Sequence, residues 1–236
     1  MKKATIKTYL WFLTILWFLI LIGFVMIFSP IKIHGNSMEN SYKNNQILWG
    51  LNYRLKNPFN HNFFGPKLFS IQRNDVLVID SKKFENMEKR QNNAPNPLIK
   101  RVIALPKETI EIKKHVVFLN GKVLHETYIS KSHFFDNVTG QITNKSKFPY
   151  LIRERMFRNN TLNNQNISVR LGNDQFFAMG DNRNYSWDSR VYGSFNINNE
   201  VKAKIIHINL PILFVKALLT IGLVVLTIIL FILELN

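Results

Sequence analysis

The stretch that decides the fold runs from Thr109 to Leu124 and reads TIEIKKHVVFLNGKVL. It contains β-rich runs at Thr109–Val117 and Val116–Leu119, followed by Asn120-Gly121 and then Lys122–Leu124. An Asn-Gly pair between apolar runs is the strongest short signal for a β-hairpin, because both residues accept the positive φ angles of a two-residue turn. This stretch therefore predicts antiparallel strands.

Similar short runs, separated by turn residues, recur at Asp75–Asp80, Leu98–Leu105 and Gln175–Met179. No long amphipathic helical repeat competes with them. We therefore expect a mainly β fold whose soluble part is an antiparallel β-sheet domain. The segment 119–173 is polar and weakly patterned over most of its length, and we interpret it as a cap or insertion.

Both ends of the chain are apolar. Tyr9–Phe28 carries no charge over 20 residues, about 30 Å as a helix and so the thickness of a bilayer core. Pro211–Leu233 is broken only by Lys216, which is close enough to one edge for its amine to reach the headgroups. The alternative for the first run is a cleavable signal peptide, but the run is long and Phe28-Ser29-Pro30 has no small-x-small pattern. We predict a transmembrane helix at each end.

Basic residues ahead of the first apolar run predict a cytoplasmic N-terminus, and two spans return the C-terminus to the same side. The expected organisation is a cytoplasmic segment at 1–8, an anchor at 9–28, one β-rich extracytoplasmic domain at 29–210 and a second span at 211–233.

The chain is strongly basic, with 31 Lys and Arg against 15 Asp and Glu and a net charge of +16. The charge is spread without a dense block, and no nucleic-acid-reading module accompanies it, so we expect attraction to anionic lipid and no nucleic-acid partner. The absence of cysteine excludes disulfides and thiol nucleophiles. The six histidines are scattered without a metal-binding spacing, so we expect neither a metal nor a cofactor.

Three short segments carry residues suited to catalysis. The first, Gly35-Asn36-Ser37-Met38, follows the predicted anchor and so holds a serine hydroxyl near the outer membrane face. A lone serine is usually a polar surface residue. With Glu39 two positions later, Ser37 also lacks the G-x-S-x-G pattern of α/β-hydrolases.

The second segment places Lys100 inside Leu98–Leu105, a run typical of a strand. Leu98, Val102 and Ala104 share its face by period-two alternation, which predicts partial burial. Burial disfavours the ammonium form, and lowering a lysine pKa from about 10.4 to about 7 requires roughly 4–5 kcal/mol. The alternative, a lysine whose amine reaches solvent from an edge strand, stays open.

The third segment, Gly180–Arg190, is rich in turn residues and follows the apolar run Gln175–Met179. It contains two acids, two arginines and two serines within eleven residues. It is either a tight loop held by Asp–Arg ion pairs or a fixed network that presents a hydroxyl at the end of a buried strand. The segment alone does not decide between these.

Together, in this order, the three segments resemble the type I signal peptidase family. In that family the nucleophile lies in G-x-S-M after a membrane anchor, the base in K-R-V-x-G-L-P, and the closing motif is G-D-N-R-x-x-S-x-D-S-R. The closing motif is matched here at Gly180, Asp181, Asn182, Arg183, Ser186, Asp188, Ser189 and Arg190. The run from Arg73 to Val78, RNDVLV, also resembles the family's G-D-I-V-V strand.

The resemblance implies a Ser–Lys dyad, with Ser37 as nucleophile and Lys100 as general base. It implies that Ser186 orients the Lys100 amine and that the Ser37 N–H stabilises the oxyanion. The supporting residues would be Asp188, Arg190, Asp181 and Arg183, and the substrate contacts Gly35, Asn36 and Met38. The implied protein is a membrane-bound serine endopeptidase of the bacterial inner membrane, active on its outer side. It would cleave signal peptides from exported preproteins after small-x-small sites.

The sequence departs from the family pattern at several positions. Gly35 stands where some members have a hydroxyl donor for the oxyanion, and Asn40 replaces the proline that follows the nucleophile. Ala104 replaces a glycine, Lys107-Glu108 replaces Gly-Asp, and Asn74 replaces the glycine before the G-D-I-V-V aspartate. These are structural substitutions, and they bear on efficiency and substrate range more than on mechanism.

Two rival functions remain. A self-cleaving Ser–Lys protease of the repressor type is disfavoured by the two predicted spans and by the lack of a DNA-binding domain. An inactive membrane-anchored β-domain that binds exported chains is disfavoured by the retained Ser37, Lys100 and Ser186. Four phenylalanines on a basic, Asn-rich insertion either enter the membrane interface or pack locally: Phe59, Phe63, Phe64 and Phe69.

Overall fold

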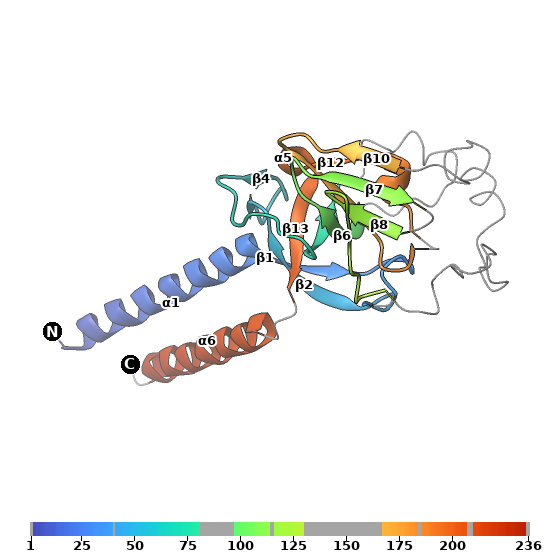
Figure 1. Cartoon of the computed structure of the whole chain (residues 1–236). Helices are drawn as coiled ribbons and strands as arrows, with labels where there is room; N and C mark the ends of the chain where they lie inside the picture. Colours follow the sequence, from blue (N-terminus) through green and yellow to red (C-terminus); the bar gives the residue numbers. More distant parts are fainter. Residues whose placement is uncertain are drawn as a thin grey trace. The chain divides into compact units, whose positions relative to one another are not determined.

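A computed structural model describes residues 2–39, 41–80, 97–113, 116–129, 167–183, 186–206 and 210–234. The chain forms two compact units from interleaved segments (Figure 1). The first unit comprises Met1–Ile31, Leu48–Leu68 and Ile206–Asn236, and the second comprises Lys32–Ile47 and Phe69–Ile205. Asn40, residues 91–96 and most of the predicted insertion at 119–173 lie outside the described residues. The boundaries expected from sequence stay predictions.

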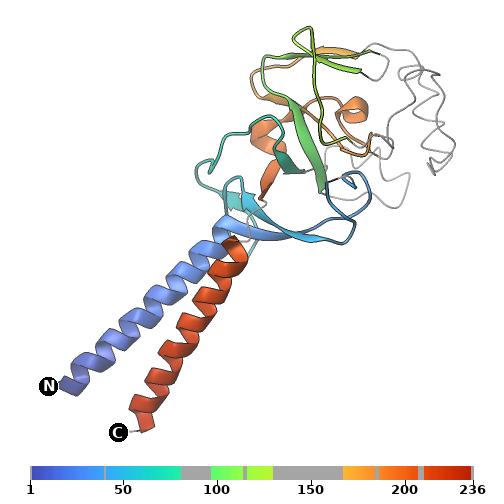
Figure 2. The same ribbon diagram turned by 60° about the horizontal axis from the view of Figure 1, so that its bottom comes forward.

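Two long helices lie side by side in the first unit: α1 (Lys2–Ile27) and α6 (Leu210–Glu234), in Figures 1 and 2. The Trp17 indole Nε1 donates a hydrogen bond to the Leu218 carbonyl, at 2.7 Å. Gly222 lies against the same ring, because a Cβ there would come within 2.5 Å of a Trp17 ring carbon. The small residue thus lets the two helices approach closely.

Both stretches predicted to span a membrane are therefore helical. Among the residues that the structure describes, however, no helix reaches the length and hydropathy expected of a membrane span.

Short strands complete the first unit. β1 (Phe28–Lys32) continues directly from α1, and β2 (Ile47–Asn52) leads into a two-stranded sheet of β3 (Leu55–Lys56) and β4 (Phe63–Phe64). The Asn52 Nδ2 donates to the Met26 carbonyl at 3.0 Å, which satisfies one of the free carbonyls at the end of α1.

The second unit is built on five antiparallel strands in the order β13-β5-β6-β11-β12. Their bounds are β13 (Val201–Ile206), β5 (Val76–Ile79), β6 (Leu98–Ala104), β11 (Gln175–Met179) and β12 (Phe195–Asn196). Strand β6 lies between β5 and β11, so both of its edges are paired, and every residue except Arg101 is buried, so both of its faces are covered as well. The sequence predicted that Lys100 is partly buried on one face of an alternating strand. In this central strand it is instead fully buried, together with most of its neighbours on both faces.

Four more antiparallel strands of the second unit form a sheet in the order β10-β7-β8-β9. These are β10 (Ile167–Arg170), β7 (Thr109–Lys113), β8 (Val116–Leu119) and β9 (Lys122–Val123). The predicted β8–β9 hairpin is confirmed, since Asn120 and Gly121 have φ angles of 48° and 79°. The prediction of one strand over Thr109–Val117 is wrong, because Lys113 pairs back with Val116 as β7 meets β8.

The core of the second unit lies where these two sheets meet. Its buried residues are Ile103, Ala104, Ile110, Val117, Leu171, Phe177 and Met179. Ala104, one of the departures from the family pattern, is completely buried in this cluster, where its methyl group fills apolar space. Two single-turn helices follow the sheet strands, α4 (Ser189–Tyr192) and α5 (Ile197–Glu200).

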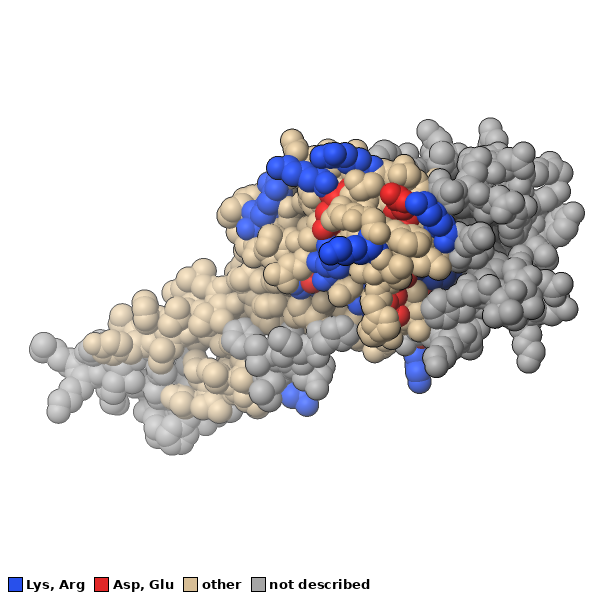
Figure 3. Space-filling view, in the orientation of Figure 1, with Lys and Arg blue, Asp and Glu red and all other residues tan. Residues whose placement is uncertain are grey.

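Basic side chains are spread over the face seen in Figure 3, with a few acidic side chains between them. Acidic side chains of the second unit pair with basic ones, as in Lys202–Asp80 and Lys204–Asp75, both at 3.0 Å. The dispersed pattern agrees with the absence of a dense basic block in the sequence.

Candidate active site

Ser37 lies on a turn that follows β1. The turn is closed by backbone hydrogen bonds from the Ser41 and Tyr42 N–H groups to the Met38 carbonyl, at 2.9 and 2.8 Å. Before it, the Gly35 N–H donates to the Asn44 Oδ1 at 3.0 Å. Ser37 is half-buried while its neighbours Gly35 and Asn36 are exposed, so its hydroxyl sits at the edge of the domain surface.

Lys100 comes from the centre of β6 and is only 3% exposed. Its Nζ lies 2.8 Å from the Ser37 Oγ and donates to the Ile99 carbonyl at 3.0 Å. Burial lowers the pKa of Lys100 to about 8; the Asp188 charge raises it and the Arg190 charge lowers it. At pH 7 about a tenth of this lysine is thus a neutral amine, against well under a thousandth for an ordinary lysine, and it lies within proton-transfer distance of a serine hydroxyl.

Ser186 was expected to orient the lysine amine, but in the structure its hydroxyl donates to the Asp188 Oδ2 at 2.7 Å. Lys100 contacts Ser37 and Ile99 instead. Gly180 lies between Ser186 and the Ser37 backbone. A Cβ added to Gly180 would come within 2.5 Å of both the Ser186 Cβ and the Ser37 carbonyl oxygen. Only a glycine allows this close approach.

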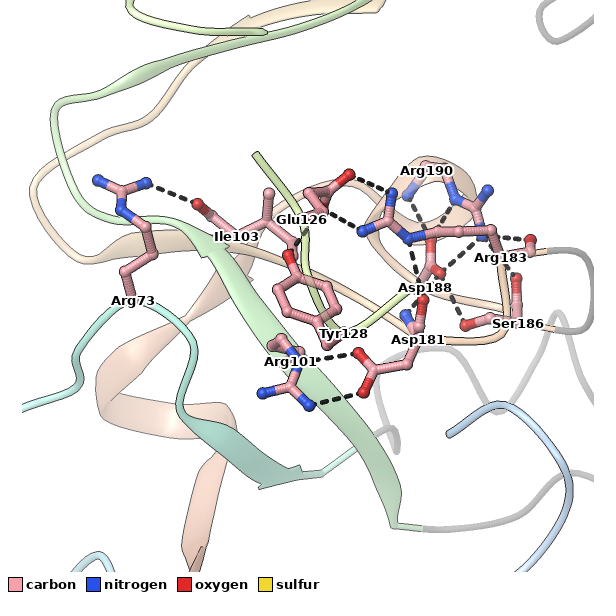
Figure 4. Close-up of polar contacts among 11 residues, drawn as sticks. Arg73, Arg101, Ile103, Glu126, Tyr128, Asp181, Arg183, Ser186, Asp188 and Arg190 are labelled. Atoms are coloured by element: carbon pink, nitrogen blue, oxygen red, sulfur yellow. Dashed lines mark hydrogen bonds and ion pairs between the residues drawn. The ribbon is translucent and has the colours of Figure 1, made fainter. Parts of the chain in front are cut away.

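Asp188 is the centre of the second half of the Gly180–Arg190 loop (Figure 4). Its completely buried carboxylate accepts from the Arg190 Nε at 2.9 Å, the Ser186 hydroxyl and the Gly180 N–H at 3.0 Å. Burial alone would raise the pKa of Asp188, but the Arg190 charge and these hydrogen bonds outweigh it and hold that pKa below its usual range. Asp188 also caps α4 by accepting from the Arg190 N–H.

Asp181 and Arg183 do not pair with each other. Asp181 is completely buried and accepts two hydrogen bonds from Arg101, at 2.8 and 2.6 Å, and one from the Ser41 hydroxyl. This two-point contact fixes the carboxylate plane relative to β6. Asp181 therefore links the loop to the strand of the lysine and to the segment after the nucleophile.

Asn182 is a residue that the sequence interpretation left without a role. Its backbone N–H donates to the Ser37 carbonyl at 3.0 Å, and its side-chain Nδ2 donates to the Asn36 carbonyl at 3.0 Å and to the Glu39 carboxylate at 3.3 Å. The side chain is completely buried. Asn182 therefore holds the nucleophile segment on both sides of Ser37, and only its place in the closing motif hinted at this.

Glu126 and Tyr128 are further supporting residues that sequence reasoning missed. Arg183 donates to the Gly180 carbonyl at 3.0 Å and makes a two-point ion pair with Glu126. Tyr128 donates to Glu126 at 2.7 Å, and its ring lies under the Arg101 guanidinium, 4.3 Å from the centroid (Figure 4). These residues lie in the polar stretch after β9, and no spacing in the sequence connects them to the loop.

The expected substrate contacts are placed differently from one another. Gly35 and Asn36 are exposed beside Ser37, whereas Met38 is only 1% exposed. The Met38 side chain therefore packs in the core beneath the nucleophile turn and supports it from the protein side.

Two of the departures from the family pattern adopt a backbone conformation that glycine would favour. Asn74 and Lys107 have φ angles of 70° and 68°, in the left-handed region. Glu108 takes an ion pair from Arg73 at 2.5 Å and a hydrogen bond from the Leu105 N–H at 2.7 Å. The local contacts thus hold these turns in place.

The arrangement is suited to nucleophilic chemistry: a hydroxyl at the surface touches a buried amine of lowered pKa, and a buried charged network fixes both. Among the described residues, no group of His, Asp and Glu gathers closely enough to hold a metal ion.

Comparison with known proteins gives the family. The family described as signal peptidase, peptidase S26, matches residues 6–207. Signal peptidase I of Bacillus caldolyticus is 28% identical over 74% of this chain and 76% of its own length. Signal peptidase I P of Bacillus subtilis subsp. natto is 28% identical over 83% of this chain and 84% of its own.

A crystal structure of a signal peptidase I from Enterococcus faecalis V583 aligns with 59% of this chain and 100% of its own, at 19% identity and a TM-score of 0.38. The family match spans most of the chain and includes all three segments that form the site. The chain therefore belongs to the signal peptidase family, peptidase S26, among the type I signal peptidases.

Proposed function

We propose that this chain removes signal peptides from exported preproteins by a Ser–Lys dyad, with Ser37 as nucleophile and Lys100 as general base. The observation that supports it most directly is the 2.8 Å separation of the Lys100 Nζ and the Ser37 Oγ, with the lysine almost fully buried. A protonated lysine on the surface would be a poor base at neutral pH. A buried one with a pKa of about 8 is a competent base.

In the first half of the reaction, the Ser37 Oγ attacks the scissile carbonyl carbon while its proton moves to the neutral Lys100 amine. The resulting oxyanion is stabilised by the Ser37 N–H. Lys100 then gives the proton to the leaving nitrogen, the C–N bond breaks, and the signal peptide stays attached to Ser37 as an ester. Water, deprotonated by Lys100, attacks that ester, and the serine recovers its proton.

Membrane attachment is part of the proposal. The 20 uncharged residues Tyr9–Phe28 and the apolar run Pro211–Leu233 support anchoring through α1 and α6. We place the chain in the bacterial inner membrane, with the β-domain outside and both termini cytoplasmic. A tethered active site meets a preprotein where its own apolar segment leaves the bilayer, and small residues at positions −1 and −3 fit a shallow site beside Ser37.

The experiment that tests the proposal uses the purified full chain in detergent with a preprotein that carries a small-x-small site. Ser37→Ala and Lys100→Ala should each abolish cleavage while the far-ultraviolet circular dichroism stays unchanged. Matched controls are Ser168→Ala and Lys122→Ala, which alter exposed residues of the second sheet.

Cleavage that persists in folded Lys100→Ala protein would exclude the dyad. Lack of cleavage by the natural sequence against several preproteins would instead favour the rival function, a membrane-anchored domain that binds exported chains without cutting them.

A further inference from the structure

The turn between β3 and β4 exposes aromatic side chains to an unusual degree. Phe59 is 89% exposed and Phe64 is 44% exposed, although phenylalanine is normally among the most buried residue types. Both belong to residues 53–68, which we call the aromatic hairpin. It lies in the first unit, together with α1.

The exposure belongs to a well-defined turn. The Asn57 Oδ1 accepts from the Phe59 N–H at 2.8 Å and from the Asn60 N–H at 3.3 Å. The backbone closes around it, since the Asn57 N–H donates to the Asn62 carbonyl at 2.8 Å and the His61 N–H donates to the Asn57 carbonyl at 2.9 Å. The local hydrogen bonds therefore hold Phe59 outward.

The charge of the aromatic hairpin is of one sign. It carries Arg54, Lys56 and Lys67, and residues 48–68 include no Asp or Glu. Arg54 donates to the Gly65 carbonyl at 3.1 Å, and the Lys67 amine lies 5.8 Å from the centre of the Tyr53 ring. Lys56 lies in β3, Arg54 immediately before that strand, and Lys67 three residues after β4, so all three cations belong to the aromatic hairpin.

The aromatic hairpin starts at the end of α1. Asn52, which precedes it by one residue, donates to the Met26 carbonyl in the last turn of the helix. Strand β3 also contacts α1 directly. Figures 1 and 2 show the turn around β4 beside that end of the helix. This is the end at which the proposed anchor leaves the bilayer.

We propose that the aromatic hairpin docks in the headgroup region of an anionic bilayer. Phe59 and Phe64 enter the interface, and Arg54, Lys56 and Lys67 lie among the lipid phosphates. Aromatic rings are favoured at this depth, and each basic residue near an anionic surface strengthens the attraction to it. The inference rests on the proposed membrane attachment and adds a second membrane contact within the first unit, beside α1.

Depth measurements in vesicles test the inference. The chain has no cysteine, so Phe59→Cys gives a single labelling site in the full chain. The control is Val123→Cys, on β9 of the second unit, where the native side chain is 63% exposed. Each variant is labelled with an environment-sensitive fluorophore and reconstituted into phosphatidylcholine–phosphatidylglycerol vesicles that contain headgroup-proximal nitroxide lipids.

The label at position 59 should emit at shorter wavelength than the label at 123 and be quenched severalfold more strongly by the nitroxide lipids. Equal emission and equal quenching at the two positions would overturn the inference and would point to a protein partner for the aromatic hairpin instead. Phe64→Cys provides a second position with the same expectation.

The charge contribution is tested with Lys56→Gln/Lys67→Gln in the Phe59→Cys background. In phosphatidylglycerol vesicles its label should be less quenched than in the parent, and the difference should vanish in pure phosphatidylcholine. A difference independent of lipid charge would contradict the role of the lysines.

Cleavage of a preprotein by the same vesicles separates this inference from the proposed function. Active protein with an unquenched label would refute only the docking of the aromatic hairpin. Inactive protein with a quenched label would refute only the peptidase mechanism.

Discussion

The nucleophile segment 35–42 and the loop 180–190 meet at one site but are held in different ways. In the nucleophile segment Gly35, Asn36 and Glu39 are exposed, and the segment's own bonds close only a short turn. In the loop, by contrast, four polar residues are completely buried and hydrogen-bonded to charged side chains: Asp181, Asn182, Ser186 and Asp188.

The difference shows where the geometry of the dyad originates. The loop reaches out to the nucleophile segment through Asn182, which holds the Asn36 and Ser37 carbonyls, and through Asp181, which accepts from Ser41. Ser37, the proposed nucleophile, can therefore lie half-buried at the edge of the domain surface because a buried neighbour positions it. Changes in the loop should cost stability and activity together, whereas changes at the contact between the two regions should affect activity selectively.

The largest effect is expected from Asp188→Asn. The change keeps the shape but leaves the Arg190 guanidinium, only 20% exposed, without its counter-charge. Breaking a buried ion pair in this way lowers the free energy of unfolding by about 3–5 kcal/mol. Urea denaturation of the detergent-solubilised protein, followed by circular dichroism, measures it. Asp174→Asn, at an exposed turn, is the control and should change little. A loss below about 0.5 kcal/mol, the range of ordinary surface changes, would mean that the loop is not the rigid partner.

The second effect concerns Lys100, a buried titratable group that contacts Ser37 and is influenced by the charges of Asp188 and Arg190. Its folded pKa of about 8 lies below the ordinary value of 10.5, so the unfolded chain binds more protons between these pH values. The free energy of unfolding therefore rises as pH increases from about 8 to 10.5, and the ammonium destabilises the fold at lower pH by about 3 kcal/mol.

Lys100→Met should remove this penalty. The inactive variant is expected to be more stable than the parent at pH 7, and the gain should shrink as pH rises toward 10.5. Parallel urea titrations across that range measure the difference. A gain that does not depend on pH would show that Lys100 is not the group responsible.

The sequence predicted those parts of the fold that depend on local chemistry. The Asn120-Gly121 hairpin follows from two neighbouring residues, and β11 was predicted with its observed bounds. Pairings between distant segments, such as β6 with β11, depend on how the whole chain packs. The sheet order was therefore not predictable from any one run of residues. The same limit explains the single strand wrongly expected over Thr109–Val117, since the run is uniformly β-rich across the reversal.

The candidate site shows the same division. The order of the motifs predicted that Ser37, Lys100 and the loop 180–190 form the site. In the structure the Lys100 Nζ and the Ser37 Oγ lie 2.8 Å apart. The ion-pair partners of the loop residues were not predictable, because a sequence motif does not indicate which basic residue pairs with which acidic one. Asp181 pairs with Arg101, and Arg183 pairs with Glu126 from a stretch without pattern. Lys107 replaces a glycine of the family pattern, yet it keeps the left-handed backbone that glycine favours, with a φ of 68°.

The third effect should appear at Gly180, where the two regions come closest. In Gly180→Ala the new Cβ would come within 2.5 Å of the Ser37 carbonyl oxygen and must push the nucleophile segment away from the loop. A displacement of about 1 Å can lower kcat/KM by about 10²-fold. Steady-state cleavage of a preprotein measures the loss. Gly172→Ala is the matched control, because the atoms nearest its Cβ belong to the flexible Gln175 side chain, at 3.2 Å and beyond. Equal activity of the two variants would show that the close approach is not needed.

The smallest effect is expected at the contact itself, from Asn182→Ala. The change removes two side-chain hydrogen bonds to the nucleophile segment, at 3.0 and 3.3 Å, but leaves the backbone bond to Ser37 in place. Within the described part of the chain the Asn182 Oδ1 is buried without a partner, so deleting the side chain also relieves an unfavourable burial. The net loss of stability should therefore stay near zero.

Activity should respond instead, because one lost hydrogen bond contributes about 1 kcal/mol and corresponds to about a fivefold lower kcat. Asn173→Ala, at an exposed turn, controls for the loss of an asparagine. A fall in kcat without a fall in the urea midpoint would show that the buried loop positions the nucleophile segment. If stability and kcat fell together, Asn182 would be part of the folding core, and the two regions would be a single rigid body rather than a support and the segment it positions.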